Sequence, residues 1–206
     1  IVHMPIVKDP EILNESFEKY EISKKINIVS CMMSQKQFEK YSEMWSKEKD
    51  LDMLRRLNGL PGHPDVNTKN ILFNTGSLGM GISKINGLSF ANKILKQNEK
   101  NIVLLGDGEL QEGQNWEALM FLQNNKNISP LIFIDSNKIQ SDTWVNKVKN
   151  YSKLKKKILS FSLNFKEIDG HNKLEILRTI KSHFKANNGA TIILANTIKG
   201  KGVSFI

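Results

Sequence analysis

An aspartate and an asparagine, each placed directly after a short apolar run, carry the clearest chemical signal in the sequence. Asp107 lies in the Gly-Asp-Gly-Glu segment 106–109, which follows the apolar run 101–105. Asn137 lies 30 residues further on and closely follows the apolar run 131–134. Short apolar runs that end at a glycine or a polar cluster are typical of buried parallel strands. Because ligands gather beyond the carboxyl ends of such strands, we expect both side chains to project into one crevice.

The oxygen atoms of these two side chains are suited to magnesium or calcium. Magnesium prefers one or two protein carboxylates and completes its shell with phosphate oxygens and water. One carboxylate from Asp107 and one amide oxygen from Asn137 therefore leave room for a diphosphate. Gly106 and Gly108 lack side chains, so the backbone can approach that diphosphate closely. A Gly-Asp-Gly segment alone is also common in ordinary turns, and it is the apolar runs before both polar residues that favour a site.

The elements that must position these residues alternate between strand-like and helix-like patterns. We expect strands at 101–105, 131–134, 165–168 and 191–196, and helices at 82–95, 114–123, 154–160 and 174–184. This alternation predicts an α/β fold with a mainly parallel sheet and helices on both faces. Residues 1–58 are polar and carry scattered apolar residues at helical spacing. We therefore expect a helical N-terminal segment over 1–58, followed by a diphosphate- and metal-binding α/β domain over 59–206.

Composition limits the classes of protein that are compatible with the sequence. The chain has 206 residues, of which 39% are hydrophobic, enough for one domain with its own core. No apolar stretch approaches about 18 residues and the N-terminus does not resemble a signal peptide, so we expect no membrane contact. The single cysteine, Cys31, excludes an internal disulfide and suits a reducing cytosol, which predicts a cytoplasmic protein. The net charge is +9, but the lysine-rich run 147–157 has few interleaved aromatic residues, which argues against nucleic acid as a partner.

Several motifs taken together resemble thiamine diphosphate enzymes, and transketolase in particular. These motifs occur in the family's order, and they are Gly62-His63-Pro64, the glycine-rich segment Thr75–Gly79, Leu104–Gly113 with Trp116–Ala118, and Thr197–Phe205. The resemblance covers about residues 59–206, and residues 1–58 are atypical for the family. The sequence most resembles the N-terminal subunit of transketolases that are encoded as two chains.

The resemblance implies a site for thiamine diphosphate and magnesium (or calcium). It places the metal on Asp107, Asn137 and the backbone carbonyl of Ile139. It places Gly76 and Leu78 against the aminopyrimidine end of the cofactor. The full set of implied cofactor-binding residues is Gly76, Ser77, Leu78, Gly106, Asp107, Gly108, Glu109, Asn137 and Ile139.

The resemblance also implies catalytic roles for three residues. His63 would lie near the reactive thiazolium carbon, where it would hydrogen-bond a developing negative oxygen or relay a proton. Glu112 and Glu117 match acidic positions between the two active sites of a transketolase dimer. They would either share a proton network, which close burial of like charges favours, or simply cap or salt-bridge a helix. His171 shows no clear chemistry, and we expect it to stabilise a loop.

The resemblance further implies a partner chain. Thiamine diphosphate is activated by a glutamate from a separate pyrimidine-binding domain, and residues 1–58 are too short to form one. We therefore expect a dimer of heterodimers that transfers a two-carbon ketol unit from a ketose to an aldose, acting on sugars or sugar phosphates. Two alternatives remain: the α-type component of a 2-oxoacid dehydrogenase, and a degenerate cofactor-binding or scaffold subunit. The second is favoured by the upstream segment, where His3 is the only histidine and matches neither of the family's upstream histidine motifs.

Overall fold

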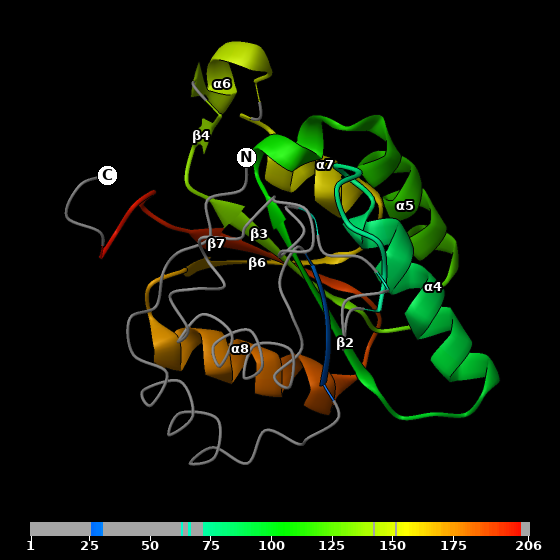
Figure 1. Ribbon diagram of the computed structural model, residues 1–206. Coiled ribbons are helices and arrows are strands. Elements are labelled where there is room, and N and C mark those ends of the chain that lie inside the picture. The colour runs from blue at the N-terminus through cyan, green and yellow to red at the C-terminus, as the bar shows by residue number, and fades with distance from the viewer. Residues whose placement is uncertain are drawn as a thin grey trace, which may run out of the picture.

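A five-stranded parallel sheet forms the centre of the molecule (Figure 1). The computed structural model describes residues 26–30, 63, 66, 72–141, 143–150 and 152–202. The strand order is β1-β2-β3-β7-β6, and every neighbouring pair is parallel. The strands are β1 (Ile26–Ser30), β2 (Lys100–Gly106), β3 (Leu131–Ser136), β6 (Asn164–Asp169) and β7 (Thr191–Asn196).

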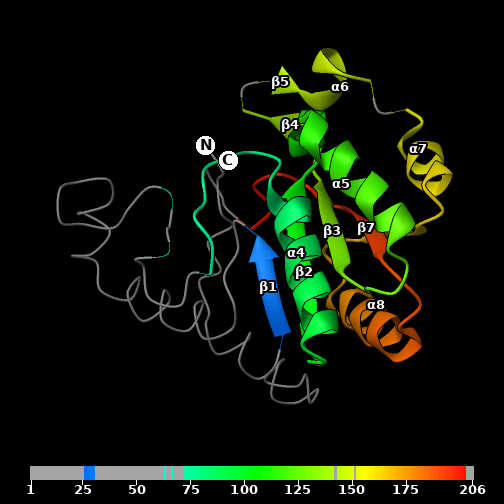
Figure 2. The same ribbon diagram turned by 90° about the vertical axis from the view of Figure 1, so that its right-hand side faces the viewer.

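Helices cover both faces of this sheet, as the alternating pattern predicted (Figures 1 and 2). On one face lie α4 (Gly81–Ile94), α5 (Gly113–Asn124) and α7 (Leu154–Ser160). On the other face lies α8 (Lys173–Ala186). The shorter elements are a 3-10 helix η1 (Gly108–Gln111), an antiparallel pair β4 (Ile139–Gln140) and β5 (Thr143–Trp144), and α6 (Val145–Val148).

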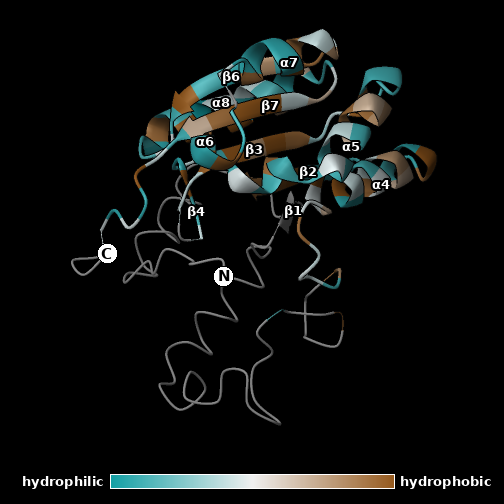
Figure 3. Ribbon diagram, turned by 90° about the horizontal axis from the view of Figure 1, so that it is seen from above, coloured by the Kyte–Doolittle hydropathy of each residue, from teal (hydrophilic) through white to brown (hydrophobic). Residues whose placement is uncertain are grey.

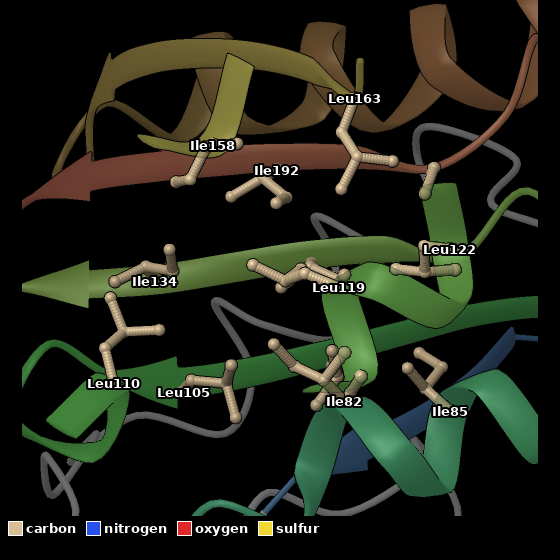
Figure 4. Close-up of a cluster of buried hydrophobic side chains, with 14 of the residues drawn as sticks. Ile82, Ile85, Leu105, Leu110, Leu119, Leu122, Ile134, Ile158, Leu163 and Ile192 are labelled. Carbon is tan, nitrogen blue, oxygen red and sulfur yellow. The ribbon is translucent and has the colours of Figure 1, made fainter. Parts of the chain in front are cut away.

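The core has two layers, one on each side of the sheet, because successive strand side chains point to opposite faces. Val103 and Leu105 of β2 pack towards α4 and α5, whereas Ile102 packs in the layer beneath α8. Figure 4 shows the first layer, with strand residues such as Ile134 and Ile192 facing helix residues. The central strands β3 and β7 are predominantly hydrophobic (Figure 3), as expected for parallel strands that are covered on both faces.

The structure confirms the predicted fold class and all eight predicted elements between residues 82 and 196, with shifts of two residues at most at their ends. The expected strand 131–134 extends to Ser136, so Asp135 belongs to β3 and Asn137 follows it directly. No helix in the described part of the chain is long and apolar enough to cross a bilayer.

The strand β1 corrects the expectation of a purely helical segment over residues 1–58. Ile26–Ser30 pairs with β2 along its length, with Ile28 opposite Ile102, and forms one edge of the sheet. A five-residue strand (Ile-Asn-Ile-Val-Ser) has too short a pattern to stand out against polar flanks, since its partner β2 lies some 70 residues away in sequence. The helices expected at 14–25 and 35–57, and the boundary at 58, lie outside the described residues.

The buried His183 makes the stability of this fold depend on pH. Its Nδ1 lies 2.8 Å from Thr191 Oγ1 and its Nε2 lies 3.0 Å from the carbonyl oxygen of Ser129. Burial lowers the pKa of His183 below its ordinary value of 6.5, against a smaller opposing effect of the bond to Ser129. The unfolded chain therefore binds a proton here at pH values where the folded chain does not.

We expect His183 to make its full contribution to the free energy of unfolding above about pH 6.5. This contribution should fall as the pH drops below that value. The contribution of His183 to the slope approaches roughly 1.4 kcal/mol per pH unit until its folded pKa is reached. Urea denaturation at pH 7.5, 6.5 and 5.5 measures this slope. The variant His183→Gln should be less stable at pH 7.5 but lose this part of the slope, and an unchanged slope would contradict the assignment.

Candidate functional site

The carboxyl ends of β2 and β3 bring together the two residues that the sequence singled out. Gly106 at the end of β2 pairs with Asp135 near the end of β3. The next residue, Asp107, donates its backbone N–H to the carbonyl oxygen of Asp135 at 3.0 Å. Asp107 and Asn137 therefore follow the carboxyl ends of two adjacent strands and lie at the same end of the sheet, as predicted from the two apolar runs.

The carboxylate of Asp107 is buried, with 5% of the residue exposed, and is held by two backbone amides. Its Oδ1 accepts the N–H of Gly108 at 2.8 Å and its Oδ2 accepts the N–H of Lys138 at 2.7 Å. Lys138 has a positive φ of 70°, an uncommon conformation for a residue with a side chain, and it belongs to the turn that follows β3. Burial raises the pKa of Asp107, and these two hydrogen bonds only partly offset that effect.

The side chain of Asn137 is fixed by hydrogen bonds at both of its polar atoms. Its Oδ1 accepts the N–H of Ile139 at 2.9 Å, and its Nδ2 donates to Asp135 Oδ2 at 3.0 Å. The other carboxylate oxygen of Asp135 accepts the hydroxyl of Thr197, which follows β7. The orientation of the amide is thus set by Asp135, and Asp135 is in turn held by Thr197.

These residues provide the hard oxygen donors that a magnesium ion requires. A cation beside the buried carboxylate of Asp107 would offset the cost of burial that raises its pKa. Each carboxylate or amide oxygen here keeps a further lone pair after the hydrogen bond it already accepts. In the described part of the chain, no group of three His, Cys, Asp or Glu residues could form an all-protein metal cage. The donor set therefore fits an ion that shares its shell with a bound anion.

The two glycines of the Gly-Asp-Gly segment differ in what surrounds them. A Cβ atom added to Gly106 would meet no atom within 4 Å, so the backbone there faces open space. A Cβ atom added to Gly108 would lie 2.8 Å from the Cβ of Gln140. Gly106 is thus open to a close ligand, whereas Gly108 allows η1 to pack against β4. Close approach of a ligand was the reason expected for both glycines, and the structure adds a packing reason for Gly108.

Glu109 points back into the molecule and joins two backbone segments. Its Oε1 accepts the N–H of Gly79 at 2.8 Å, and its Oε2 accepts the N–H of Gly106 at 3.4 Å. Burial raises the pKa of Glu109, while these two hydrogen bonds act in the opposite direction. The carboxylate therefore connects the glycine-rich segment Thr75–Gly79 with the turn at the end of β2.

The segment Thr75–Gly79 also lies against His63. A Cβ atom added to Gly76 would lie 3.3 Å from Cγ of His63, so the imidazole packs on this glycine. Gly76 and Gly79 have φ angles of 109° and 85°, which residues with a side chain rarely adopt. Ser77 and Leu78 are exposed between them. The two motifs, which are separate in the sequence, are therefore in contact.

Glu112 and Glu117 lie at the surface of α5 in the single chain. Glu112 occupies the position before the first helical residue, but its side chain makes no capping hydrogen bond. His171 fits the expected loop role, because its Nε2 accepts the N–H of Ile198 at 2.9 Å. Sequence reasoning assigned no role to Asp135 or Thr197, although Thr197 opens one of the quoted motifs and Asp135 immediately follows a predicted strand.

A parallel α/β sheet with a carboxylate and an amide at adjacent strand ends is typical of α/β proteins that bind a ligand beyond the carboxyl ends of their strands. A family model for the transketolase, thiamine diphosphate binding domain matches residues 30–205. The chain belongs to this family. The match begins 29 residues before the region that carries the family's motifs, and its first residue is the last residue of β1.

Curated relatives include proteins that are named as transketolase subunits. The chain is 38% identical over 157 residues to the 6-deoxy-6-sulfo-D-fructose transketolase subunit SqwG of Clostridium sp. (strain MSTE9), covering 75% of this chain and 57% of that protein. It is 36% identical over 148 residues to an apulose-4-phosphate transketolase subunit of Actinobacillus succinogenes, covering 71% and 53%. The chain thus spans about half the length of these relatives.

The solved structure of transketolase from Campylobacter jejuni has the same fold. It superposes with a TM-score of 0.72 at 26% sequence identity, covering 87% of this chain and 30% of that one. The similarity supports the assignment of the sheet and its helices to the thiamine diphosphate-binding domain of the family.

Proposed function

We propose that this chain is the diphosphate- and magnesium-binding subunit of a two-chain transketolase. The observation that carries the proposal is the placement of Asp107 and Asn137 directly after the adjacent ends of β2 and β3. In the proposed site, Asp107, Asn137 and the backbone carbonyl of Ile139 hold the metal ion. When bound, thiamine diphosphate supplies the carbanion chemistry that cleaves and forms carbon–carbon bonds.

The remaining residues of the proposed site bind or orient. The open backbone at Gly106 supports a close approach of the diphosphate, with Gly108 and Glu109 beside it. Gly76, Ser77 and Leu78 form the wall for the aminopyrimidine end of the cofactor, and His63 lies against this wall. His63 is then placed to donate a hydrogen bond to an oxygen that gains negative charge, or to carry a proton.

Glu112 and Glu117 are proposed to meet their counterparts from a second copy of the chain. Both are exposed at the surface of α5, so any shared proton network there requires another molecule. This arrangement supports a dimer of heterodimers, in which a second chain supplies the pyrimidine-binding domain and its glutamate. The relatives that are named as subunits support the existence of such a partner.

The reaction that we propose is transfer of a two-carbon ketol unit from a ketose to an aldose. The names of two relatives refer to a sulfonated sugar and a sugar phosphate, which supports an anionic sugar as substrate. The net charge of +9 would favour the approach of such substrates.

The pairing of β1 with β2 and the family match from residue 30 support a diphosphate-binding domain that begins with β1. The single cysteine supports a cytoplasmic location.

The two alternatives are less well supported. The family match and the named relatives are of the transketolase type rather than of the 2-oxoacid dehydrogenase type. A buried carboxylate at Asp107, whose burial is only partly compensated by its two backbone hydrogen bonds, favours a cofactor-binding subunit over a scaffold, since a bound cation would offset the remaining cost.

The proposal is tested by combining this chain with a chain that carries the pyrimidine-binding domain, in the presence of thiamine diphosphate and magnesium. Transfer of a two-carbon unit from a ketose phosphate to an aldose phosphate, followed by mass spectrometry of the products, is the expected result. Calorimetry with each chain alone and with the mixture measures cofactor binding. Failure of the mixture to bind thiamine diphosphate would refute the enzyme and favour the scaffold.

Thr197 gives a prediction about the proposed metal site that needs no substrate. We expect Thr197→Val to weaken the affinity for Mg²⁺, measured at saturating thiamine diphosphate in the assembled protein, by less than the roughly 10–100-fold seen for direct partners of metal ligands, because Thr197 acts on Asn137 only through Asp135. Valine keeps the shape of the side chain but removes the hydroxyl that Asp135 accepts. Thr197→Ser keeps the hydroxyl and should bind Mg²⁺ as the wild type does. Equal affinities for valine and serine would exclude an orienting role for Thr197.

A further inference from the structure

We propose that Glu109 is a positioning residue that holds the glycine-rich segment Thr75–Gly79 against the turn at the end of β2, and that it is not itself a ligand of the cofactor. The consequence for cofactor binding rests on the proposed function, whereas the positioning itself does not. This assignment differs from the cofactor-binding role that the sequence resemblance implied for Glu109.

The carboxylate of Glu109 is already used by the protein at both of its oxygens. Oε1 accepts the N–H of Gly79, and Oε2 accepts the N–H of Gly106. These two amides belong to segments that are far apart in the chain, one before α4 and the other at the end of β2. A carboxylate is the side-chain group that can accept from both amides at once, because each of its oxygens is an acceptor.

Two further contacts attach the same segment to the region around Glu109. The side chain of Gln114 donates a hydrogen bond through Nε2 to the carbonyl oxygen of Leu78. Gly79 is buried and packs so closely that a Cβ atom there would lie 2.5 Å from the Cβ of Glu112. Glu109, Glu112 and Gln114 therefore all lie against Leu78 or Gly79, directly before α4.

The backbone on which Glu109 stands is itself fixed from within the core. Asn115, which is fully buried, donates through Nδ2 to the carbonyl oxygen of Glu109 at 2.7 Å. Trp116 donates through Nε1 to the carbonyl oxygen of Leu110 at 3.0 Å. The side chain of Glu109 thus extends from a 3-10 turn that two side chains of α5 hold in place, which suits a residue that positions another segment.

The segment that Glu109 holds carries the contact between Gly76 and His63. A shift of Gly79 would be passed along only two residues before it reached Gly76. The position of His63 relative to Asp107 therefore depends on the two hydrogen bonds of Glu109. This links the metal-binding end of the proposed site to the end at which His63 lies.

Hydrogen exchange of individual backbone amides, followed by NMR on the full chain without cofactor, tests the positioning role directly. In the wild type the amides of Gly79 and Gly106 should be protected. In Glu109→Ala both should exchange faster, by about tenfold or more at Gly79, as expected for the loss of a hydrogen bond to a charged group. In Glu109→Gln the single carbonyl oxygen can serve one amide fully, so one of the two should stay protected.

Glu175→Ala is the matched control. It also removes a carboxylate that accepts a backbone N–H, that of Asp169 at 3.2 Å, but it lies at the start of α8 on the other face of the sheet. It should speed exchange at Asp169 and leave Gly79 unchanged. The amide of Lys157 in α7, which donates to the carbonyl oxygen of Lys153 at 3.0 Å, serves as an internal reference in every variant.

Equal exchange at Gly79 in the wild type and in both Glu109 variants would overturn the proposal. If Glu109→Ala does not fold, the glutamine variant still decides between the outcomes. If both amides keep their full protection in Glu109→Gln, the proposal that they share the carboxylate is wrong. Thiamine diphosphate binding in the assembled protein separates the roles further. If a Glu109 variant binds thiamine diphosphate more weakly while exchange at Gly79 is unchanged, Glu109 is a cofactor ligand and the proposal is wrong. If even the wild type does not bind thiamine diphosphate, the proposed function is refuted and the exchange result still holds.

Discussion

Replacing Asp107 by alanine is expected to weaken magnesium-dependent binding of thiamine diphosphate by more than about 100-fold. Even residues that only support a metal ligand change metal affinity by about 10–100-fold when they are mutated, so loss of the one anionic ligand in the proposed set should exceed this. Asp107 is 5% exposed and lies where two strand ends meet, so its carboxylate lies within the fold and not in bulk water. Calorimetry of the assembled protein, with and without magnesium, measures the effect.

Asp107→Asn is the control that separates charge from shape. Asparagine has the same size and keeps one oxygen that can accept the N–H of Gly108 or Lys138, but it carries no charge. We expect it to fold, although one of the two backbone amides loses its acceptor, and to bind the metal more weakly than the wild type but better than alanine. Binding of thiamine diphosphate by the alanine variant at wild-type affinity, with an unchanged dependence on magnesium, would remove Asp107 from the metal site.

The central part of the fold was predictable because its signals are local. The runs 101–105 and 131–134 are predominantly apolar and end at polar residues or a glycine, so both the strands and the edge at which Asp107 and Asn137 meet follow from the sequence. Parallel strands that are covered on both faces need this kind of run, and its short length and its glycine or polar end distinguish it from a buried helix segment. The adjacency of the two side chains then follows from the geometry of the sheet.

The parts that were missed depend on contacts between distant segments. The strand β1 becomes a strand by pairing with β2, and its own five residues carry little pattern. Glu109 looks like one more acidic residue in a motif, and only the approach of Gly79, 30 residues earlier in sequence, reveals its role. Asp135 and Thr197 are 62 positions apart and meet only because β3 and β7 are neighbours. A single sequence records such pairs as separate polar residues.

Replacing a glycine of this chain by alanine is expected to change the free energy of unfolding in a direction that depends on the position of the glycine. Gly79→Ala is expected to lower the free energy of unfolding by roughly 2–4 kcal/mol, because a φ of 85° strains a residue with a side chain and the new Cβ would lie 2.5 Å from Cβ of Glu112. Glu112 cannot relieve this contact by a rotation of its side chain, since the Cβ atom moves only with the backbone. Urea denaturation of the full chain at neutral pH measures the change.

Gly87→Ala is the matched variant, with the same added atom and the opposite expected result. Gly87 is exposed in the middle of α4, its φ is not positive, and an added Cβ would meet no atom within 4 Å. Alanine stabilises a helix interior by roughly 0.5–1 kcal/mol relative to glycine, so this variant should unfold at a higher urea concentration. If both variants changed stability in the same direction, the packing of Gly79 against residues 109–114 would be wrong. Because α4 begins two residues after Gly79, opposite signs would show that the glycine is required by the turn that docks on Glu109 and Glu112, and not by the helix that follows it.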